Sequence, residues 1–201
     1  MGRGVAALLS PGNEILLGSR DPARSRKTAE DLSRILGGSV RGGSNEEIAE
    51  RCELAILCIP DPSESGLLER LQEPLRAKIV VSPIVPMRFE SGLFIYSKLS
   101  WSAAEDVAGV LRGSRVVAAL HHLPALTIQR RARSVNFDVL VACDERIDFE
   151  EFAEFLKAAT DLRPLYAGPL KSARILESLT PLLINCGKLN KLGSLSLRLV
   201  S

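Results

Sequence analysis

The chain has 201 residues, 46% of them hydrophobic and 25% charged, which is enough to bury a core as one large domain or as one domain with a small partner. Its 26 Lys and Arg against 24 Asp and Glu give a formal net charge of +2, which argues against recognition of nucleic acid by bulk electrostatics. Apolar runs of about five to eight residues are far shorter than the roughly 18 that a membrane-spanning helix needs, and no signal segment is visible. We therefore expect a cytoplasmic protein with no membrane or nucleic-acid partner.

The cysteines are scattered and contain no Cys-x-x-Cys pair. They are Cys52, Cys58, Cys143 and Cys186. Three of them lie in apolar stretches, where a small buried thiol is the ordinary interpretation. We expect neither disulfides nor a structural metal site.

The first part of the chain alternates short apolar runs, typical of strands, with segments that have helical spacing. Residues 15–18 predict a strand, and Asp21-Pro22 is a favourable N-cap and first-turn pair for the helix after it. The expected apolar face of that helix is Ala29, Leu32, Ile35 and Leu36. Ser44 or Asn45 can then begin a short helix.

The same alternation continues as far as residue 120. Residues 54–59 predict a buried strand, Asp61-Pro62 repeats the capping pair, and residues 79–81 predict another strand that stops at Ser82-Pro83. The helix between them has an apolar stripe of Leu67, Leu68 and Leu71. Residues 102–105 have the spacing of a capping box, and the helix that they open, through Leu111, precedes a strand at residues 116–120. The pattern predicts an α/β fold with a doubly wound parallel sheet.

After residue 124 the pattern changes, and we place a soft domain boundary within residues 125–136. The remaining elements expected are a strand at 137–143, a helix at 149–159, a strand at 162–165 and a long helix at 172–192. The Arg130, Arg131 and Arg133 cluster is interpreted as a solvated face. The apolar stripe expected on the long helix is Ile175, Leu176, Leu179, Leu182, Leu183 and Cys186. Arg174, Ser178 and Asn185 form a neighbouring polar line, and Pro181 should bend the helix.

The N-terminus lacks the first, central strand of a dinucleotide-binding sheet and the glycine-rich turn that follows it. Residues 5–9 are typical of the helix that comes after that turn, so Gly2 would be the last glycine of a G-x-G-x-x-G fingerprint. We prefer the interpretation that the start codon is assigned too late over a chain that really begins here. The alternative is that Gly2 and Gly4 are a flexible terminus.

The end of the 15–18 strand should face the adenosine ribose of a dinucleotide. Ser19 and Arg20 lie there, with Arg24 one helical turn later. A hydroxyl and two guanidinium groups suit a 2′-phosphate, because Arg donates in a planar fork and carries a fixed charge. This favours NADP over NAD, although Asp21 could accept from a ribose hydroxyl. Exposed charges at a helix start remain the alternative.

His121 and His122 are the only histidines. Adjacent residues at a strand end point to opposite sides, so we do not expect them to share a metal. We expect one to face the cleft at the carboxyl end of the sheet, and the other to pack or meet solvent. No G-x-S-x-G or H-E-x-x-H motif supports a hydrolase.

Five motifs in order carry a family resemblance. They are Gly18-Ser19-Arg20, residues 78–86 (KIVVSPIVP), 102–105 (SAAE), 119–125 (ALHHLPA) and 174–182 (RILESLTPL). Together they closely resemble the NADPH-dependent coenzyme F-420 reductases, also called deazaflavin-dependent NADP oxidoreductases, of archaea and some bacteria. The resemblance covers nearly the whole chain, except that family members begin roughly a dozen residues earlier, with the strand and glycines absent here.

The resemblance implies an N-terminally truncated, Rossmann-like NADP-binding domain at residues 1–130 and a small C-terminal α+β domain at residues 131–201. It also implies hydride transfer between NADP(H) and coenzyme F-420 (8-hydroxy-5-deazaflavin), through positioning, with no catalytic side chain and no metal, in a homodimer. By position, Ser19, Arg20 and Arg24 match the 2′-phosphate site, Ile59 and Pro60 the nicotinamide side, and His121 with Leu123 the cleft. Ser82, Pro83, Val85, Pro86, Arg174 and Ser178 match the surroundings of the deazaflavin.

Two other functions stay open. The first is a reductase of another small substrate such as an imine, because many Rossmann proteins share this first half. The second is a non-catalytic NADP-binding or assembly module that uses its long helix as a dimer contact.

Overall fold

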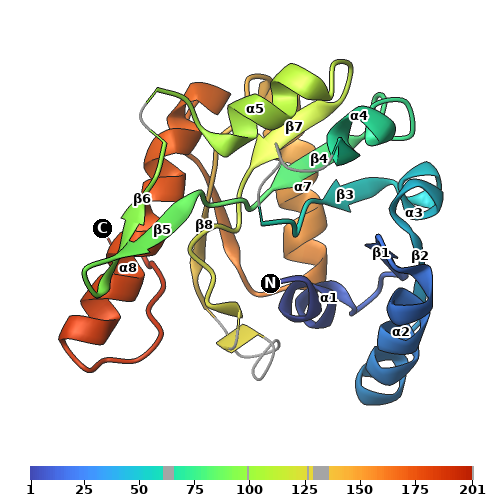
Figure 1. The fold of residues 1–201 in the computed structure, drawn as a ribbon, viewed down its shortest axis with the longest axis horizontal. Helices are drawn as coiled ribbons and strands as arrows, with labels where there is room; N and C mark the ends of the chain where they lie inside the picture. The colour runs from blue at the N-terminus through green and yellow to red at the C-terminus, as the bar shows by residue number, and fades with distance from the viewer. Residues whose placement is uncertain (61–65, 99, 126, 129–135, 201) are drawn as a thin grey trace.

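The computed structural model describes residues 1–60, 66–98, 100–125, 127–128 and 136–200. Helices and strands alternate along the chain (Figure 1). The strands are β1 (Ile15–Ser19), β2 (Val40–Ser44), β3 (Leu54–Ile56), β4 (Ile79–Ser82), β5 (Met87–Glu90), β6 (Leu93–Tyr96), β7 (Arg115–Ala118), β8 (Asp138–Val141) and β9 (Arg163–Tyr166). The helices are α1 (Gly2–Leu9), α2 (Pro22–Leu36), α3 (Asn45–Arg51), α4 (Leu67–Leu71), α5 (Ala103–Val110), α7 (Arg146–Ala159) and α8 (Ala173–Leu189), with a 3₁₀ turn at Leu170–Ser172.

Parallel strand pairs build the sheet, which confirms the predicted fold class. β1 pairs with β2, and a separate three-stranded group has the order β3-β4-β7, with all neighbours parallel. β8 and β9 are also parallel, and an antiparallel bridge between Ala118 and Ala142 links them to the end of β7. The chain builds β1 then β2 in one direction and returns through α3 to build β3, β4 and β7 in the other. This reversal is the topological switch point of a Rossmann-like sheet.

The predicted caps are present. Asp21 accepts a hydrogen bond from the Arg24 N–H at the start of α2, and Ser44 accepts from Glu47 at the start of α3. The capping box at Ser102 and Glu105 opens α5. One residue on the expected apolar face of α2 was misplaced, because Ile35 is 77% exposed near the end of the helix. The Asp61-Pro62 pair and the Arg130, Arg131 and Arg133 cluster lie outside the described residues.

The sequence prediction lacked two features. β2 was not expected, and neither was the antiparallel hairpin of β5 and β6, which interrupts the parallel pattern after β4. Conversely, the strand expected at 54–59 is limited to β3, because the chain turns at Cys58, whose N–H donates to the Ile56 carbonyl.

The long C-terminal helix lies along the β5-β6 hairpin (Figure 1), and α8 continues through Pro181. Half of its predicted apolar stripe was wrong: Ile175 and Leu182 are more than 60% exposed, and Cys186 is exposed, whereas Leu176 is buried. The buried face instead consists of Ala173, Leu176, Glu177, Pro181 and Gly187. A small and partly polar face is buried because α8 packs on the hairpin and on the start of α5 rather than on a wide apolar layer.

The two faces of the sheet carry two hydrophobic clusters. Val80 and Val81 are neighbours on β4, both fully buried, and they belong to different clusters because successive strand residues point to opposite faces. Val81 packs in a cluster with Phe152 of α7, whereas Val80 packs in a cluster with Leu176 of α8. Each cluster therefore contains residues from both sides of the expected boundary at 130 and 131, and the division into two domains stays a prediction.

Candidate functional site

A cavity of about 670 Å³ lies at the switch point, between β1 and β3. Apolar side chains of α1, β1 and β3 line it, and Gly2 and Ile59 are the predicted site residues on its wall. In open α/β sheets, ligands bind in the crevice outside the carboxyl ends of the strands at this point. The cavity extends along both strands, from Ile15 and Leu54 onward, and only its end near Gly2, Gly18 and Ile59 reaches the crevice where a dinucleotide binds in this fold.

Backbone groups of two strands also face this cavity. The Ile15 N–H donates to the Ser39 carbonyl on the β2 side, so the next residue, Leu16, presents its backbone to the opposite edge. In the same way, the Leu57 N–H donates toward β4, and Ile56 presents its backbone to the cavity. Within the described residues no strand pairs with either edge. The expectation that a central strand precedes residue 1 stays a prediction.

The first turn of α1 lies at the mouth of the cavity. Gly2 lies close to Cys58: a Cβ added to Gly2 would be 3.6 Å from the Cys58 Cβ. Among the described residues, no side chain caps the N-terminus of this helix, so its first N–H groups are left without a side-chain acceptor there. Such a terminus is suited to an anion, because unpaired N–H groups and the helix dipole both favour negative charge.

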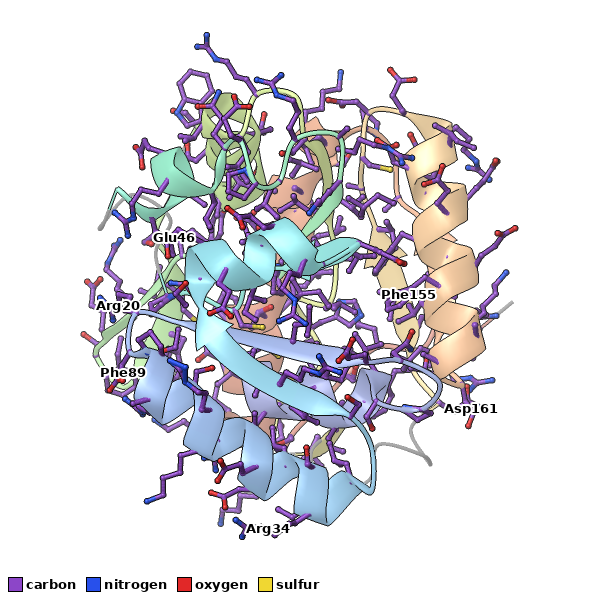
Figure 2. All side chains as sticks on the ribbon, turned by 90° about the vertical axis from the view of Figure 1, so that its right-hand side faces the viewer. Arg20, Arg34, Glu46, Phe89, Phe155 and Asp161 are labelled. Carbon is purple, nitrogen blue, oxygen red and sulfur yellow. The ribbon has the colours of Figure 1, made fainter. Side chains whose placement is uncertain are left out.

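The end of β1 and the start of α2 present two cationic side chains. Arg20 and Arg24 are exposed, and their guanidinium groups make no hydrogen bond or ion pair with any residue that the structure describes. The Ser19 hydroxyl accepts from the Asp21 N–H at 3.2 Å, and the Asp21 carboxylate is used as the cap of α2. Figure 2 shows Arg20 on the side of the molecule where α2 and α3 begin, with Phe155 and Asp161 on the opposite side. The structure thus brings Ser19, Arg20 and Arg24 together around one exposed corner.

A second group of predicted site residues follows the ends of β4 and β7, and none of them lines the cavity at the switch point. Ser82 and Pro83 are buried, whereas Val85 and Pro86 are half-buried. Ser82 ends β4, and the strand beside it, β7, ends at Ala118, two residues before the end of the strand expected at 116–120. The chain then runs through Leu120 to His121 and Leu123, which are 2% exposed each. Leu120 has a φ of 69° although it is not glycine. Strained backbone of this kind concentrates at functional sites, where the surrounding packing holds it in place.

Both histidines are buried, so neither meets solvent. Burial lowers the pKa of His121 to about 3, with a further contribution from His122, and lowers the pKa of His122 as well. The nearby Ser82 backbone opposes the shift, yet neither ring nitrogen of His121 makes a hydrogen bond with any described residue. The Nε2 atom of His122 lies 2.6 Å from the Asp138 carbonyl oxygen. Both imidazoles are therefore neutral at physiological pH.

This burial predicts a loss of stability in acid. The ordinary His pKa of 6.5 applies to the unfolded chain, which binds more protons than the folded protein as the pH falls from 6.5 toward 3. The free energy of unfolding should therefore fall by about 1.5 kcal/mol for His121 between pH 6.5 and 5. Urea unfolding across this range should show a shallower pH dependence for His121→Gln than for the natural protein. An identical dependence would mean that His121 titrates normally in the fold.

Arg174 and Ser178 lie on α8, away from the cavity at the switch point. The Arg174 guanidinium donates to the Ser100 carbonyl, and the Ser178 hydroxyl donates to the Ile175 carbonyl within its own helix. Asn185, the third member of the predicted polar line, bonds to the backbone of β6. All three residues of the predicted polar line therefore make hydrogen bonds, and the partner of Asn185 is the β5-β6 hairpin.

Sequence reasoning missed Glu177, which is 0% exposed in the second turn of α8. Its carboxylate accepts from the Tyr96 hydroxyl at 2.6 Å and from the N–H groups of Ala103 and Ala104 at 3.0 and 3.1 Å. Burial raises the pKa of Glu177, although these hydrogen bonds oppose the shift. The only available signal was a charged residue within a run of apolar ones.

The described residues contain neither a membrane-spanning helix nor a group of metal-ligating side chains. In the described part of the chain, no helix combines the length and the apolar composition that crossing a bilayer requires. Among the same residues, no three His, Cys, Asp or Glu side chains gather where they could hold a metal ion.

Comparisons with known proteins agree with this geometry. Residues 1–86 match the family model described as NADP oxidoreductase coenzyme F420-dependent. The F420-dependent NADP reductase of Methanothermobacter thermautotrophicus is 31% identical, over 94% of this chain and 85% of that protein. The reductase of the same name from Methanothermobacter marburgensis is 30% identical, over 100% of this chain and 93% of that protein.

Solved structures show the same fold. A protein from Arthrobacter sp. FB24, described as an F420-dependent NADP reductase, superposes with a TM-score of 0.80 at 22% identity, over 100% of this chain and 94% of its own. An imine reductase from Myxococcus stipitatus gives a TM-score of 0.64 at 16% identity, over 95% of this chain and 60% of its own. On the sequence identity to the two Methanothermobacter enzymes, the chain belongs to the F420-dependent NADP reductase family.

Proposed function

We propose that this protein transfers a hydride between NADP(H) and coenzyme F-420, an 8-hydroxy-5-deazaflavin. Membership of the family supports the reaction. The observation that carries the choice of NADP is the pair of Arg20 and Arg24, which are exposed beside the switch point and make no ion pair among the described residues. NAD carries only a neutral hydroxyl at the ribose 2′ position, so it offers no negative charge to this pair.

The residues present fit NADP. Ser19, Arg20 and Arg24 would hold the 2′-phosphate through charge-assisted hydrogen bonds. The uncapped N-terminus of α1, at Gly2, would hold the pyrophosphate. Ile59 and Pro60, which follow β3, would lie on the nicotinamide side.

The segments that follow β4 and β7 would position the nicotinamide and deazaflavin rings. His121 and Leu123 are fixed by burial and by the strained turn at Leu120, so the segment after β7 has one arrangement. The loop of Ser82, Pro83, Val85 and Pro86 would contact the deazaflavin from the end of β4, with Arg174 and Ser178 from α8.

The two bound coenzymes supply the hydride chemistry themselves. The chain has to hold the reacting atoms about 3 to 3.5 Å apart and keep water out. Hydride transfer does not require His121 to donate or accept a proton, which agrees with an imidazole that burial keeps neutral. We therefore assign no general acid, base or nucleophile.

We also propose a homodimer that uses the exposed apolar residues of α8, a cytoplasmic location and the two-domain division at residues 130 and 131. Ile175, Leu182 and Leu189 are each more than 60% exposed on that helix. A second copy could cover them, since exposed apolar side chains gathered on one helix are typical of an association surface.

The function is tested with the protein expressed from its own reading frame. Reduced coenzyme F-420 is mixed with NADP, or with NAD as the control, and the reappearance of deazaflavin absorbance is followed. We expect turnover with NADP and at least about a hundredfold lower kcat/KM with NAD, since two charge-assisted contacts are lost. A folded protein that turns over with neither nucleotide would overturn the proposal.

A further inference from the structure

The β5-β6 hairpin is fastened to α8 by polar side chains along its length. The Asn185 side-chain amide accepts from the Phe94 N–H at 2.9 Å and donates to the Phe94 carbonyl at 2.7 Å. The Lys188 ammonium donates to the Gly92 carbonyl, and the Tyr96 hydroxyl donates to Glu177. The outer edge of β6 is thus satisfied by a helix instead of another strand (Figure 1).

The hairpin in turn holds the loop that follows β4. The Ser97 N–H donates to the Pro86 carbonyl at 2.9 Å, which closes the base of the hairpin directly after the loop of residues 83–86. Tyr96 is the last residue of β6 and lies beside this base. A shift of Tyr96 would therefore be transmitted to Pro86.

Glu177 is the point where three segments meet. One buried carboxylate, in the second turn of α8, accepts from Tyr96 at the hairpin base and from the first two N–H groups of α5. A buried carboxylate that meets three donors is held in one place, because losing any partner leaves a buried polar group unpaired. The three bonds fix the hairpin base relative to α5 and α8.

We propose that Glu177 and Tyr96 are positioning residues that set the width of the deazaflavin side of the cleft. This inference rests on the proposed function. Glu177 acts through Tyr96 and the hairpin base on the loop of residues 83–86, and it does not touch the NADP side, where Ser19, Arg20 and Arg24 belong to other elements.

Tyr96→Phe is the gentlest test, because it removes one hydroxyl and keeps the ring. Tyr166→Phe is a matched control: Tyr166 is the chain's other tyrosine, and its hydroxyl donates to the Cys143 carbonyl at 3.2 Å, on the β9 side of the molecule. Both variants lose one hydrogen bond, so both should lower the melting temperature by a few degrees. A merely structural role predicts no further difference between them.

The readouts are the dissociation constant of coenzyme F-420, from its fluorescence, and the KM values for both coenzymes. We expect Tyr96→Phe to weaken coenzyme F-420 binding about tenfold and to leave the KM for NADPH within about twofold, whereas Tyr166→Phe changes neither. Glu177→Gln should reproduce the Tyr96→Phe pattern with a larger loss of stability, because its NH₂ would face an N–H of α5. Adding Tyr96→Phe to Glu177→Gln should weaken coenzyme F-420 binding by less than the product of the two single effects.

Equal coenzyme F-420 binding by the natural protein, Tyr96→Phe and Tyr166→Phe would overturn the positioning role while leaving the proposed function intact. An equal loss for both coenzymes in Tyr96→Phe would also overturn it, since the effect would then be general loosening. Absence of coenzyme F-420 binding in the natural protein would overturn the proposed function itself, and the positioning role with it.

Discussion

Arg20→Ala should weaken NADPH binding by about 30-fold to 100-fold and change NADH binding by less than about threefold. The guanidinium of Arg20 is exposed beside the end of β1 and makes no ion pair with any described residue, so its removal breaks nothing within the fold. A charge-assisted bond to a phosphate is lost only with NADPH, because NADH carries no 2′-phosphate. Nucleotide fluorescence titrations of both forms measure the two constants.

Arg34→Ala is the control for this prediction. Arg34 lies near the C-terminal end of α2, the helix that follows Arg20 in the chain (Figure 2), and among the described residues it pairs only with Asp31, at 3.4 Å in an exposed position. Its removal also lowers the net charge by one but should leave both nucleotides unaffected. If Arg20→Ala weakened NADPH and NADH equally, the assignment of Arg20 to the 2′-phosphate would be wrong.

Gly42→Ala should destabilise the protein by about 3 kcal/mol. A Cβ at Gly42 of β2 would lie 2.5 Å from the backbone N of Arg26 and from the backbone C of Ser25. These are backbone atoms of α2, so the helix would have to move away from the sheet as a unit. Since α2 also carries Arg24, NADPH affinity should fall with stability. Urea unfolding gives the free energy.

Gly109→Ala is its matched control. Gly109 lies within α5, is exposed, and has nothing within 4 Å of an added Cβ. Alanine is the better helix residue, so this variant should gain about 0.5 to 1 kcal/mol. A loss below about 1 kcal/mol in Gly42→Ala would show that α2 does not pack directly on β2.

The same glycine explains why β2 was missed in the sequence. Val40 to Ser44 contains two adjacent glycines, a composition that argues against a strand. The strand forms because α2 packs so closely on it that only glycine fits at residue 42. Tertiary packing, which the local sequence does not display, decides this element. By contrast, α2 and α5 could be predicted because Asp21 and Ser102 cap them within three residues.

The candidate site also contains residues that local sequence could predict and residues that it could not. Ser19, Arg20 and Arg24 lie within six residues of one another, so strand and helix periodicity was enough to bring them together. Glu177 could not be found by such reasoning, because its partners lie 73, 74 and 81 residues away. The contacts of a buried carboxylate become visible only once α5, α8 and the hairpin are placed.

Isotope transfer tests the central claim most directly. NADPH carrying deuterium at the transferred C4 position is mixed with oxidised coenzyme F-420 and the protein expressed from its own reading frame, and the deazaflavin product is analysed by mass spectrometry. Direct transfer between two positioned rings predicts one deuterium per reduced deazaflavin, with no loss to solvent. Deuterium released into water, or a product labelled only when the solvent is D₂O, would contradict hydride transfer by positioning alone.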